Sequence, residues 1–141
     1  MSRKINCILL IDDDEATNFL SNIILEDAGV AEHIKTKQTA KAALNYIEDS
    51  AHLNGNPNTL PFPDLIFLDM NMPAMDGWEF VEVYRELAAR IRRQSVIVML
   101  TTSLNPDDRL RAMAIPEILS FENKPLTLDI VESVISRFFP T

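Results

Sequence analysis

The sequence predicts an α/β fold in which a parallel β-sheet is covered by helices on both faces. Three short apolar runs, at residues 7–11, 65–68 and 96–100, are each followed at once by polar residues. Runs of this length are too short for helices and are typical of strands buried on both faces. Because segments with helical spacing lie between them, strand and helix alternate along the chain, and this order favours right-handed crossovers between parallel strands.

The first strand, residues 7–11, is followed by a segment with helical periodicity. Its apolar residues form one stripe of the kind that packs against a core. They are Ala16, Phe19, Leu20, Ile23 and Ile24. A partly alternating pattern at residues 31–37 predicts the second strand, and a second helix follows it. The stripe of that helix is Ala40, Ala43, Leu44 and Ile47.

Residues 52–63 are rich in turn formers and predict a loop before the third strand at 65–68. The loop is longer than a helix-to-strand connection needs, which indicates an insertion with no role in the chemistry. The third helix begins at Asp76, whose side chain can accept from the amide of Glu79. Its apolar stripe is Phe80, Tyr84, Leu87, Ala88 and Ile91.

Capping residues also mark the last two helices. Residues 105–108, Asn-Pro-Asp-Asp, offer a side-chain cap, a first-turn proline and two acids that match the helix dipole. The short segment 118–121 is expected to be the fifth strand because of its place in the alternation. The final helix runs from Thr127 to about Phe138. Its buried face consists of Ile130, Val131, Val134, Ile135 and Phe138.

Composition limits the range of functions. With 141 residues, the chain has the length of one domain with a substantial core. Its formal net charge of -8 has the wrong sign for binding nucleic-acid phosphates, so we expect no direct nucleic-acid contact. Cys7 has no second cysteine as a partner, and the apolar run around it ends in acids after a few residues. We therefore expect a cytoplasmic protein without a membrane span.

Polar residues follow the strands at the edge where parallel α/β sheets bind ligands. Acids come after the first strand, an acid and an amide after the third, hydroxyls after the fourth, and a lysine after the fifth. These residues are Asp12, Asp13 and Asp14, then Asp69 and Asn71, then Thr101, Thr102 and Ser103, and finally Lys124. Because the carboxyl ends of parallel strands share one edge, they should form one pocket.

Converging carboxylates favour a divalent cation with oxygen ligands, because the cation offsets their mutual repulsion. Mg²⁺ is the expected ion, and Mn²⁺ would suit the same donors. An aspartate can also attack phosphorus to form an acyl phosphate when metal, lysine and hydrogen-bond donors neutralise the transferring group. Asp69, Thr101 and Lys124 supply the groups for that reaction.

Several motifs together resemble the receiver domain of bacterial response regulators, over nearly the whole chain. They are the runs 8–14 (Ile-Leu-Leu-Ile-Asp-Asp-Asp) and 64–73 (Asp-Leu-Ile-Phe-Leu-Asp-Met-Asn-Met-Pro), with Asp76-Gly77, Leu100-Thr101 and Lys124-Pro125. The resemblance implies a flavodoxin-like (βα)5 three-layer sandwich with a five-stranded parallel sheet of order 2-1-3-4-5. Residues 1–141 would form a single receiver domain with no effector domain, similar to the chemotaxis response regulator.

The same resemblance implies a role for each site residue. Asp69 would be the phosphoacceptor, and Lys124 would pair with the phosphoryl group. Asp13, Asp69 and the main-chain carbonyl of Asn71 would bind the metal, with Asp12 assisting through water. Thr101 would turn its hydroxyl toward the phosphoryl oxygen, Thr102 would donate its amide, and Phe121 would change rotamer in response. The Lys124-Pro125 peptide bond would be cis.

The chain departs from the family pattern at two of these positions. Receivers often have tyrosine where this chain has Phe121, so the ring keeps its volume but loses a hydroxyl. Many receivers have a smaller residue at the position of Thr102, whose side chain could narrow access to the phosphoryl group. These differences bear on partner recognition and on the phosphoryl lifetime.

The expected function is that of a phosphoprotein in a two-component phosphorelay. A sensor histidine kinase or a histidine phosphotransfer protein would donate the phosphoryl group, and a downstream protein would bind according to phosphorylation state. The responding surface would be the fourth helix, the fifth strand and the fifth helix. Whether that face also forms a homodimer stays open, as do the cognate kinase, the signal and the target.

Two other functions compete with this interpretation. A phosphatase of the haloacid dehalogenase type also uses an aspartate nucleophile and Mg²⁺, but it needs a second aspartate two positions later. Asn71 stands there and cannot act as a general acid or base. We therefore expect no enzyme turnover, only assistance by the chain to its own phosphorylation and dephosphorylation. The second competing function is that of a receiver-like module that binds its partners independently of phosphorylation.

Overall fold

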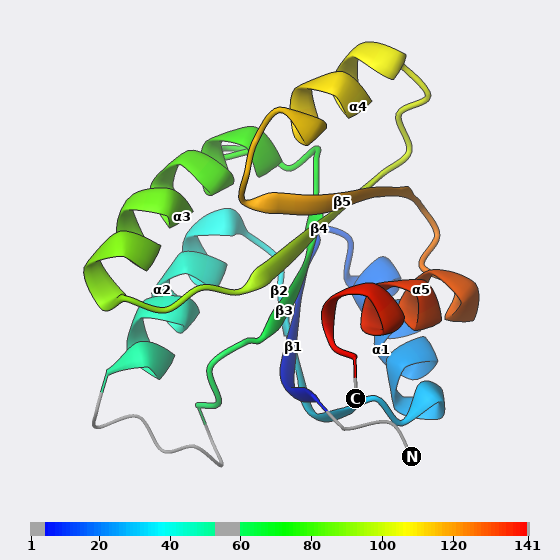
Figure 1. The fold of residues 1–141 in the computed structure, drawn as a ribbon, viewed down its shortest axis with the longest axis horizontal. Coiled ribbons are helices and arrows are strands. Elements are labelled where there is room, and N and C mark those ends of the chain that lie inside the picture. The colour runs from blue at the N-terminus through cyan, green and yellow to red at the C-terminus, as the bar shows by residue number, and fades with distance from the viewer. Residues whose placement is uncertain (1–4, 53–59, 141) are drawn as a thin grey trace.

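The computed structural model describes residues 5–52 and 60–140, which form a three-layer α/β fold (Figure 1). The strands are β1 (Ile5–Ile11), β2 (Ala31–Lys37), β3 (Leu65–Asp69), β4 (Val96–Thr101) and β5 (Ile118–Asn123). The helices are α1 (Glu15–Ala28), α2 (Ala40–Ala51), α3 (Gly77–Ile91), α4 (Pro106–Met113) and α5 (Leu128–Phe138). Every predicted element is present. The predicted loop at 52–63 lies partly outside the described residues.

All five strands of the described sheet are parallel and follow the order β2-β1-β3-β4-β5. The expected flavodoxin-like topology is therefore confirmed. The register aligns Ile11 with Leu68, Asp69 with Leu100, and Thr101 with Asn123. The last residues of these strands consequently lie side by side along one edge of the sheet.

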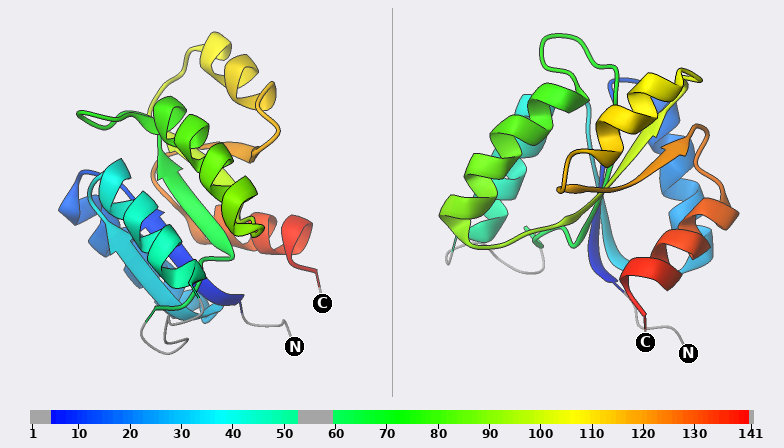
Figure 2. Two further views of the ribbon diagram at one scale, coloured as in Figure 1. Left: turned by 90° about the vertical axis from the view of Figure 1, so that its left-hand side faces the viewer. Right: turned by 45° about the horizontal axis from the view of Figure 1, so that its top comes forward.

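Two apolar cores fill the spaces between the sheet and its helices. Successive strand residues point to opposite faces. Leu9, Ile66 and Ile97 pack on the side of α2 and α3. Ile8, Leu65 and Val98 pack on the side of α1 and α5. Figure 2 shows these two helix layers, with α4 projecting beyond β5.

The predicted start and inner face of α3 are confirmed. Asp76 accepts a hydrogen bond from the Glu79 amide at 2.9 Å, and the Glu79 side chain accepts from the Asp76 amide at 3.3 Å. This reciprocal capping box satisfies donors that the first turn otherwise leaves free. Phe80 and Tyr84 from the predicted stripe are almost completely buried. Thus the apolar periodicity identified the face of α3 that packs on the sheet.

Of the predicted apolar stripe of α1, only Ile24 packs against the core. Phe19 is 64% exposed and Leu20 62% exposed. The inner face of α1 instead buries Asn18, Ser21 and Leu25. Two of these side chains are polar, so a search for apolar periodicity selects the wrong side of this helix. Phe19, Leu20 and Ile23 instead form an exposed apolar surface on α1.

The ends of α4 and α5 agree with the predicted caps. The Asn105 side chain accepts from the Asp107 amide at 3.0 Å, and the Thr127 hydroxyl oxygen accepts from the Ile130 amide at 3.2 Å. The Lys124-Pro125 peptide bond is cis, as the resemblance implied. Among the described residues, none of the helices has both the length and the apolar character that crossing a membrane requires.

Candidate functional site

Three aspartates meet where β1 and β3 end. Asp12 and Asp69 are each only 5% exposed, whereas Asp13 is exposed. One carboxylate oxygen from each of the three lies within 4.8 Å of the others. The backbone positions Asp12, because its amide donates to the Lys37 carbonyl at 3.1 Å. The predicted acidic pocket is therefore formed by adjacent strand ends.

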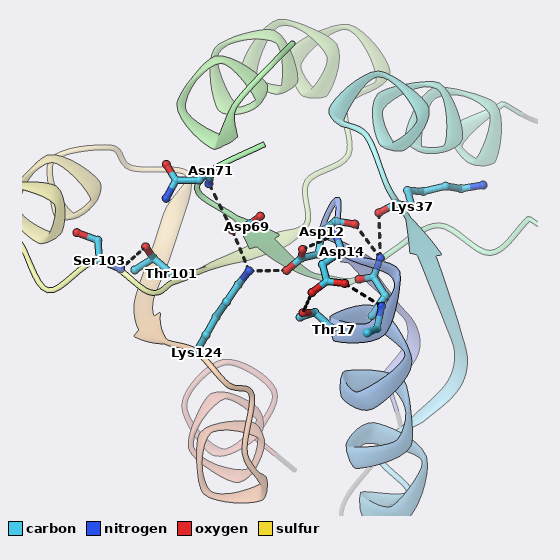
Figure 3. Close-up of polar contacts among 11 residues, drawn as sticks. Asp12, Asp14, Thr17, Lys37, Asp69, Asn71, Thr101, Ser103 and Lys124 are labelled. Atoms are coloured by element: carbon cyan, nitrogen blue, oxygen red, sulfur yellow. Dashed lines mark hydrogen bonds and ion pairs between the residues drawn. The ribbon is translucent and has the colours of Figure 1, made fainter. Parts of the chain in front are cut away.

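Lys124 reaches into this acidic pocket from the segment after β5. Its Nζ donates to Asp12 Oδ2 at 2.5 Å and forms an ion pair with Asp69 Oδ1 at 3.0 Å (Figure 3). Burial acts to lower the pKa of Lys124, but the hydrogen bonds to Asp12 and Asp69 outweigh it and raise that pKa. The ammonium group is therefore held in its charged form between the two carboxylates.

The environment of Asp69 combines burial with one strong donor. Burial raises the pKa of its carboxyl group, and the nearby charge of Asp12 acts in the same direction, while the hydrogen bond from Lys124 opposes the shift. The Asn71 amide donates to Asp69 Oδ1 at 3.3 Å. The Asp69 carboxylate is thus largely shielded from water, and Lys124 provides the compensating positive charge.

Thr101 ends β4 and is completely buried. Its Oγ1 accepts from the Ser103 amide at 2.9 Å, and its carbonyl accepts from the Lys124 amide at 2.8 Å. Thr102 follows with an exposed side chain, and Phe121 lies on β5, only 4% exposed and aligned with Met99. The predicted threonines and lysine share one edge of the sheet, while Phe121 is farther back in its strand.

Asp14, the third acid of the run, has a separate structural task. Its carboxylate accepts from the Ala16 amide at 3.0 Å and from the Thr17 hydroxyl at 2.9 Å, so it caps α1. The hydrogen bond from Thr17, followed by that from the Ala16 amide, lowers the pKa of Asp14. Asp14 lies outside the group of three carboxylates that could hold a metal.

Asn18 supports the site, and sequence patterns did not identify it. Its side chain is buried, and Nδ2 donates to the Asp12 carbonyl at 2.9 Å and to the Lys37 carbonyl at 3.4 Å. It thereby joins the ends of β1 and β2 beneath the acids. The one signal in the sequence was a polar residue on a helix, and such residues are usually solvent-exposed.

The three carboxylates fit a hard divalent cation. Mg²⁺ prefers oxygen donors and typically uses one or two carboxylates together with water and phosphate oxygens. Asp12, Asp13 and Asp69 offer such oxygens in one cluster, and Asp13 keeps the cluster open to solvent. The donor set therefore suits Mg²⁺.

Comparison with known proteins agrees with the fold. The family model of the response regulator receiver domain matches residues 8–135. The chain is 30% identical to the probable methanogenesis regulatory protein FilR2 of Methanothrix harundinacea, over 92% of this chain and 79% of that protein. It is 29% identical to the response regulator Rcp1 of Synechocystis, over 72% of this chain and 65% of that protein.

A solved structure extends the similarity to three dimensions. A two-component response regulator from Cytophaga hutchinsonii superposes with a TM-score of 0.83 at 29% identity, covering 96% of this chain and 97% of that one. Sequence and fold thus agree over almost the same residues. The chain belongs to the response regulator receiver domain family of two-component signalling.

Proposed function

We propose that the chain accepts a phosphoryl group on Asp69 in a Mg²⁺-dependent reaction, in the cytoplasm, and thereby changes its affinity for a partner protein. The donor is a sensor histidine kinase or a histidine phosphotransfer protein. One observation carries this proposal: Lys124 Nζ lies within hydrogen-bond distance of both Asp12 and Asp69, beside the carboxylate of Asp13. This arrangement supplies a nucleophile, a fixed cation and a metal site together.

In the proposed reaction an Asp69 carboxylate oxygen attacks the phosphorus of a phosphohistidine. A new O–P bond forms while the N–P bond breaks, and the departing imidazole nitrogen keeps the bonding pair and takes a proton. Lys124 offsets the negative charge on the phosphoryl oxygens, and the buried Thr101 hydroxyl turns from Ser103 to donate to one of them. The Thr102 amide is the remaining proposed donor.

The metal has a defined place in this proposal. Asp12, Asp13, Asp69 and the main-chain carbonyl of Asn71 would hold Mg²⁺, with Asp12 acting through water. When bound, Mg²⁺ supplies positive charge next to the phosphoryl oxygens. Asp13 is the exposed member of the group, so we expect Asp13→Asn to weaken Mg²⁺ binding with little effect on folding.

Acetyl phosphate provides the direct test, because it needs no cognate kinase. Incubation with acetyl phosphate and Mg²⁺ should add one phosphoryl group, detected by mass spectrometry and mapped to Asp69. Asp69→Asn should abolish the addition, and EDTA should suppress it in the wild type. Lys124→Ala should still allow some phosphorylation but weaken the conformational response. Phosphorylation of Asp69→Asn at the wild-type level would refute the site.

Two exposed apolar surfaces support the binding of two separate partners, a phosphodonor and a protein that responds to phosphorylation. The first is on α1, the helix that begins after the aspartate run 12–14, where Phe19 and Leu20 are exposed. We assign it to the phosphodonor. Phe19→Ser should slow phosphotransfer from a phosphorylated histidine phosphotransfer protein and leave the reaction with acetyl phosphate unchanged. An equal loss in both reactions would contradict this assignment.

The second apolar surface lies on α4 and β5. It consists of Leu104, Leu110, Met113 and Leu119, which are 44% to 89% exposed. Exposed apolar side chains gathered in one area commonly mark protein contacts. We assign this surface to the downstream protein or to a second copy of the chain. Gel filtration with and without beryllofluoride and Mg²⁺ distinguishes a second copy from a different protein.

Turnover of phosphate esters is not part of the proposal. Asn71 carries an amide where the dehalogenase-type phosphatases need an aspartate, and an amide cannot exchange protons in that role. We expect no sustained hydrolysis of p-nitrophenyl phosphate. Continuous release of p-nitrophenol above the level of Asp69→Asn would favour the phosphatase instead.

A further inference from the structure

Among the described helices, α4 has little apolar anchorage. Ala112 is its one buried residue, whereas Leu110 is 68% exposed and Met113 47% exposed. Helices of this length are marginal on their own in water. Contacts other than core packing must therefore help to hold α4 in place. The side chains that reach from it to the rest of the fold are largely polar.

Arg109 is the first of these side chains. Its Nη1 donates to the main-chain carbonyl of Phe121 at 3.1 Å. The Cζ atom of the same guanidinium lies 6.0 Å from the centroid of the Phe121 ring. A guanidinium near an aromatic face is attracted by the ring quadrupole. Arg109 therefore links α4 to both the main chain and the ring of Phe121.

Arg111 makes the second connection, on another side of α4. Its Cζ lies 4.2 Å from the centroid of the Trp78 ring in the first turn of α3. The preceding residue, Gly77, donates its amide to the Met70 carbonyl at 2.9 Å. Met70 directly follows Asp69. Arg111 therefore joins α4 to the segment that carries the proposed phosphoacceptor.

Ser103 connects the start of α4 to the same site. Its amide donates to Thr101 Oγ1 at 2.9 Å, and its hydroxyl donates to Asp108 Oδ2 at 2.5 Å. Its carbonyl accepts from Asn123 Nδ2 at 3.1 Å. If the Thr101 hydroxyl turns toward a phosphoryl group, the Ser103 amide loses this acceptor. The first turn of α4 is then less firmly fixed.

We propose that Arg109 and Arg111 are positioning residues that hold α4 as a displaceable helix and couple its position to Phe121 and to the Asp69–Trp78 segment. The proposal rests on the proposed phosphorylation of Asp69 and specifies how that event reaches the apolar surface of α4 and β5. When Phe121 or the Asp69–Trp78 segment moves, an arginine contact breaks. The balance of α4 positions shifts by the free energy of that contact.

Hydrogen exchange of the α4 amides tests the holding role without any phosphorylation. Arg109→Met and Arg111→Met keep an apolar stem but remove the guanidinium. We expect about twofold to fivefold faster exchange in residues 107–113 for each, with larger effects in the double variant. The matched control is Arg90→Met, because Arg90 pairs with Glu48 at the far end of α3. Wild-type exchange in α4 of the double variant would overturn the proposal.

A second arm tests the coupling. Acetyl phosphate and Mg²⁺ should change the exchange of α4 in the wild type, and this change should shrink about threefold in Arg109→Met at equal phosphate content by mass spectrometry. Arg109→Lys should restore part of it. An undiminished change in Arg109→Met would overturn the coupling. Absence of phosphate on Asp69 would instead refute the proposed function, and the exchange of the unphosphorylated variants would still decide whether the arginines hold α4.

Discussion

The helices α3 and α4 follow neighbouring strands of the same sheet, yet they are anchored in different ways. The α3 helix has 15 residues, begins with a capping box and buries seven residues. The α4 helix has 8 residues and buries one. In the sequence both follow a strand end, a short connecting segment and a capping residue. The difference lies in how much of each helix contacts the core.

In the proposed function, this difference separates two tasks at one site. Phosphoryl transfer requires Asp69 to keep a fixed geometry, and the buried face of α3 fixes the segment after β3. A signal requires an element that can move at a small cost in free energy. Helices with few buried apolar contacts belong to the less stable parts of a fold. On this view α3 supports the chemistry and α4 transmits its result.

Truncating one apolar side chain on each helix gives the largest expected contrast. Phe80 on α3 is fully buried, and Phe80→Ala should lower the free energy of unfolding by about 3–5 kcal/mol. Leu110 on α4 is exposed, and Leu110→Ala should change it by less than about 0.5 kcal/mol. Urea unfolding followed by circular dichroism measures both values. Similar losses in the two variants would show that α4 is as firmly packed as α3.

Substitution of Gly77 tests how closely α3 approaches Asp69, the proposed phosphoacceptor. A Cβ at this position would lie 2.8 Å from the Asp69 carbonyl oxygen and 3.0 Å from the Met70 Cα. Both are backbone atoms and cannot rotate away, so Gly77→Ala should cost about 1–3 kcal/mol and slow phosphorylation by acetyl phosphate.

Gly29→Ala is the matched control for Gly77→Ala. Gly29 has φ 64, and a Cβ there would have no neighbour within 4 Å. The control should therefore lose about 1 kcal/mol through backbone strain alone and keep the wild-type rate of phosphorylation. Equal phosphorylation rates in the two variants would mean that Gly77 has no special role beside Asp69.

Ala74 lies in the loop between β3 and α3, with φ 68. A side chain disfavours this left-handed conformation, so Ala74→Gly should raise the free energy of unfolding by about 0.5–1 kcal/mol. The control on the α4 side is Ala114→Gly, because Ala114 has φ -81 and gains nothing from glycine. That variant should be slightly less stable than the wild type. Thermal melting compares the two, and destabilisation by both changes would rule out strain at Ala74.

The order of the elements could be predicted because buried strands and capped helices leave local signals. The runs that became β1, β3 and β4 are apolar throughout, and Asp76 and Asn105 cap their helices as expected. The inner face of α1 could not be predicted in the same way. Asn18 is buried there because strand-end carbonyls accept its amide hydrogens, and those acceptors come from Asp12 and Lys37, which only the fold brings together.

The composition of the site was likewise predictable, but the contacts around it were not. Asp12, Asp69, Thr101 and Lys124 follow strands whose ends must share an edge once the sheet is parallel. The contacts of Arg109 with Phe121 and of Arg111 with Trp78 join segments with no common pattern in the sequence. These contacts depend on where α4 lies in the fold, and for that reason only the structure revealed them.

The smallest expected effect concerns a direct contact between α3 and the segment that joins α4 to β5. On α3, Arg85 donates through Nε and Nη2 to the carboxylate of Glu117, just before β5, at 2.9 and 2.8 Å. The hydrogen bonding from Arg85 lowers the pKa of Glu117 from its usual 4.5. A carboxylate with a lowered folded-state pKa adds stability above its unfolded pKa and loses it as pH falls through the folded value. The ion pair should therefore contribute at pH 7 and fade below about pH 4.5.

Arg85→Met measures this contribution, because methionine keeps an apolar stem and removes the charge. The variant should be only slightly less stable than the wild type at pH 7, because the pair is partly exposed and screened by solvent. The difference should shrink in urea unfolding as pH falls below about 4.5 and Glu117 takes up a proton. A difference that stays constant from pH 7 to pH 3 would assign the loss to packing of the arginine stem. Apolar packing would then link α3 to the segment after α4, and the difference in anchoring between α3 and α4 would be smaller.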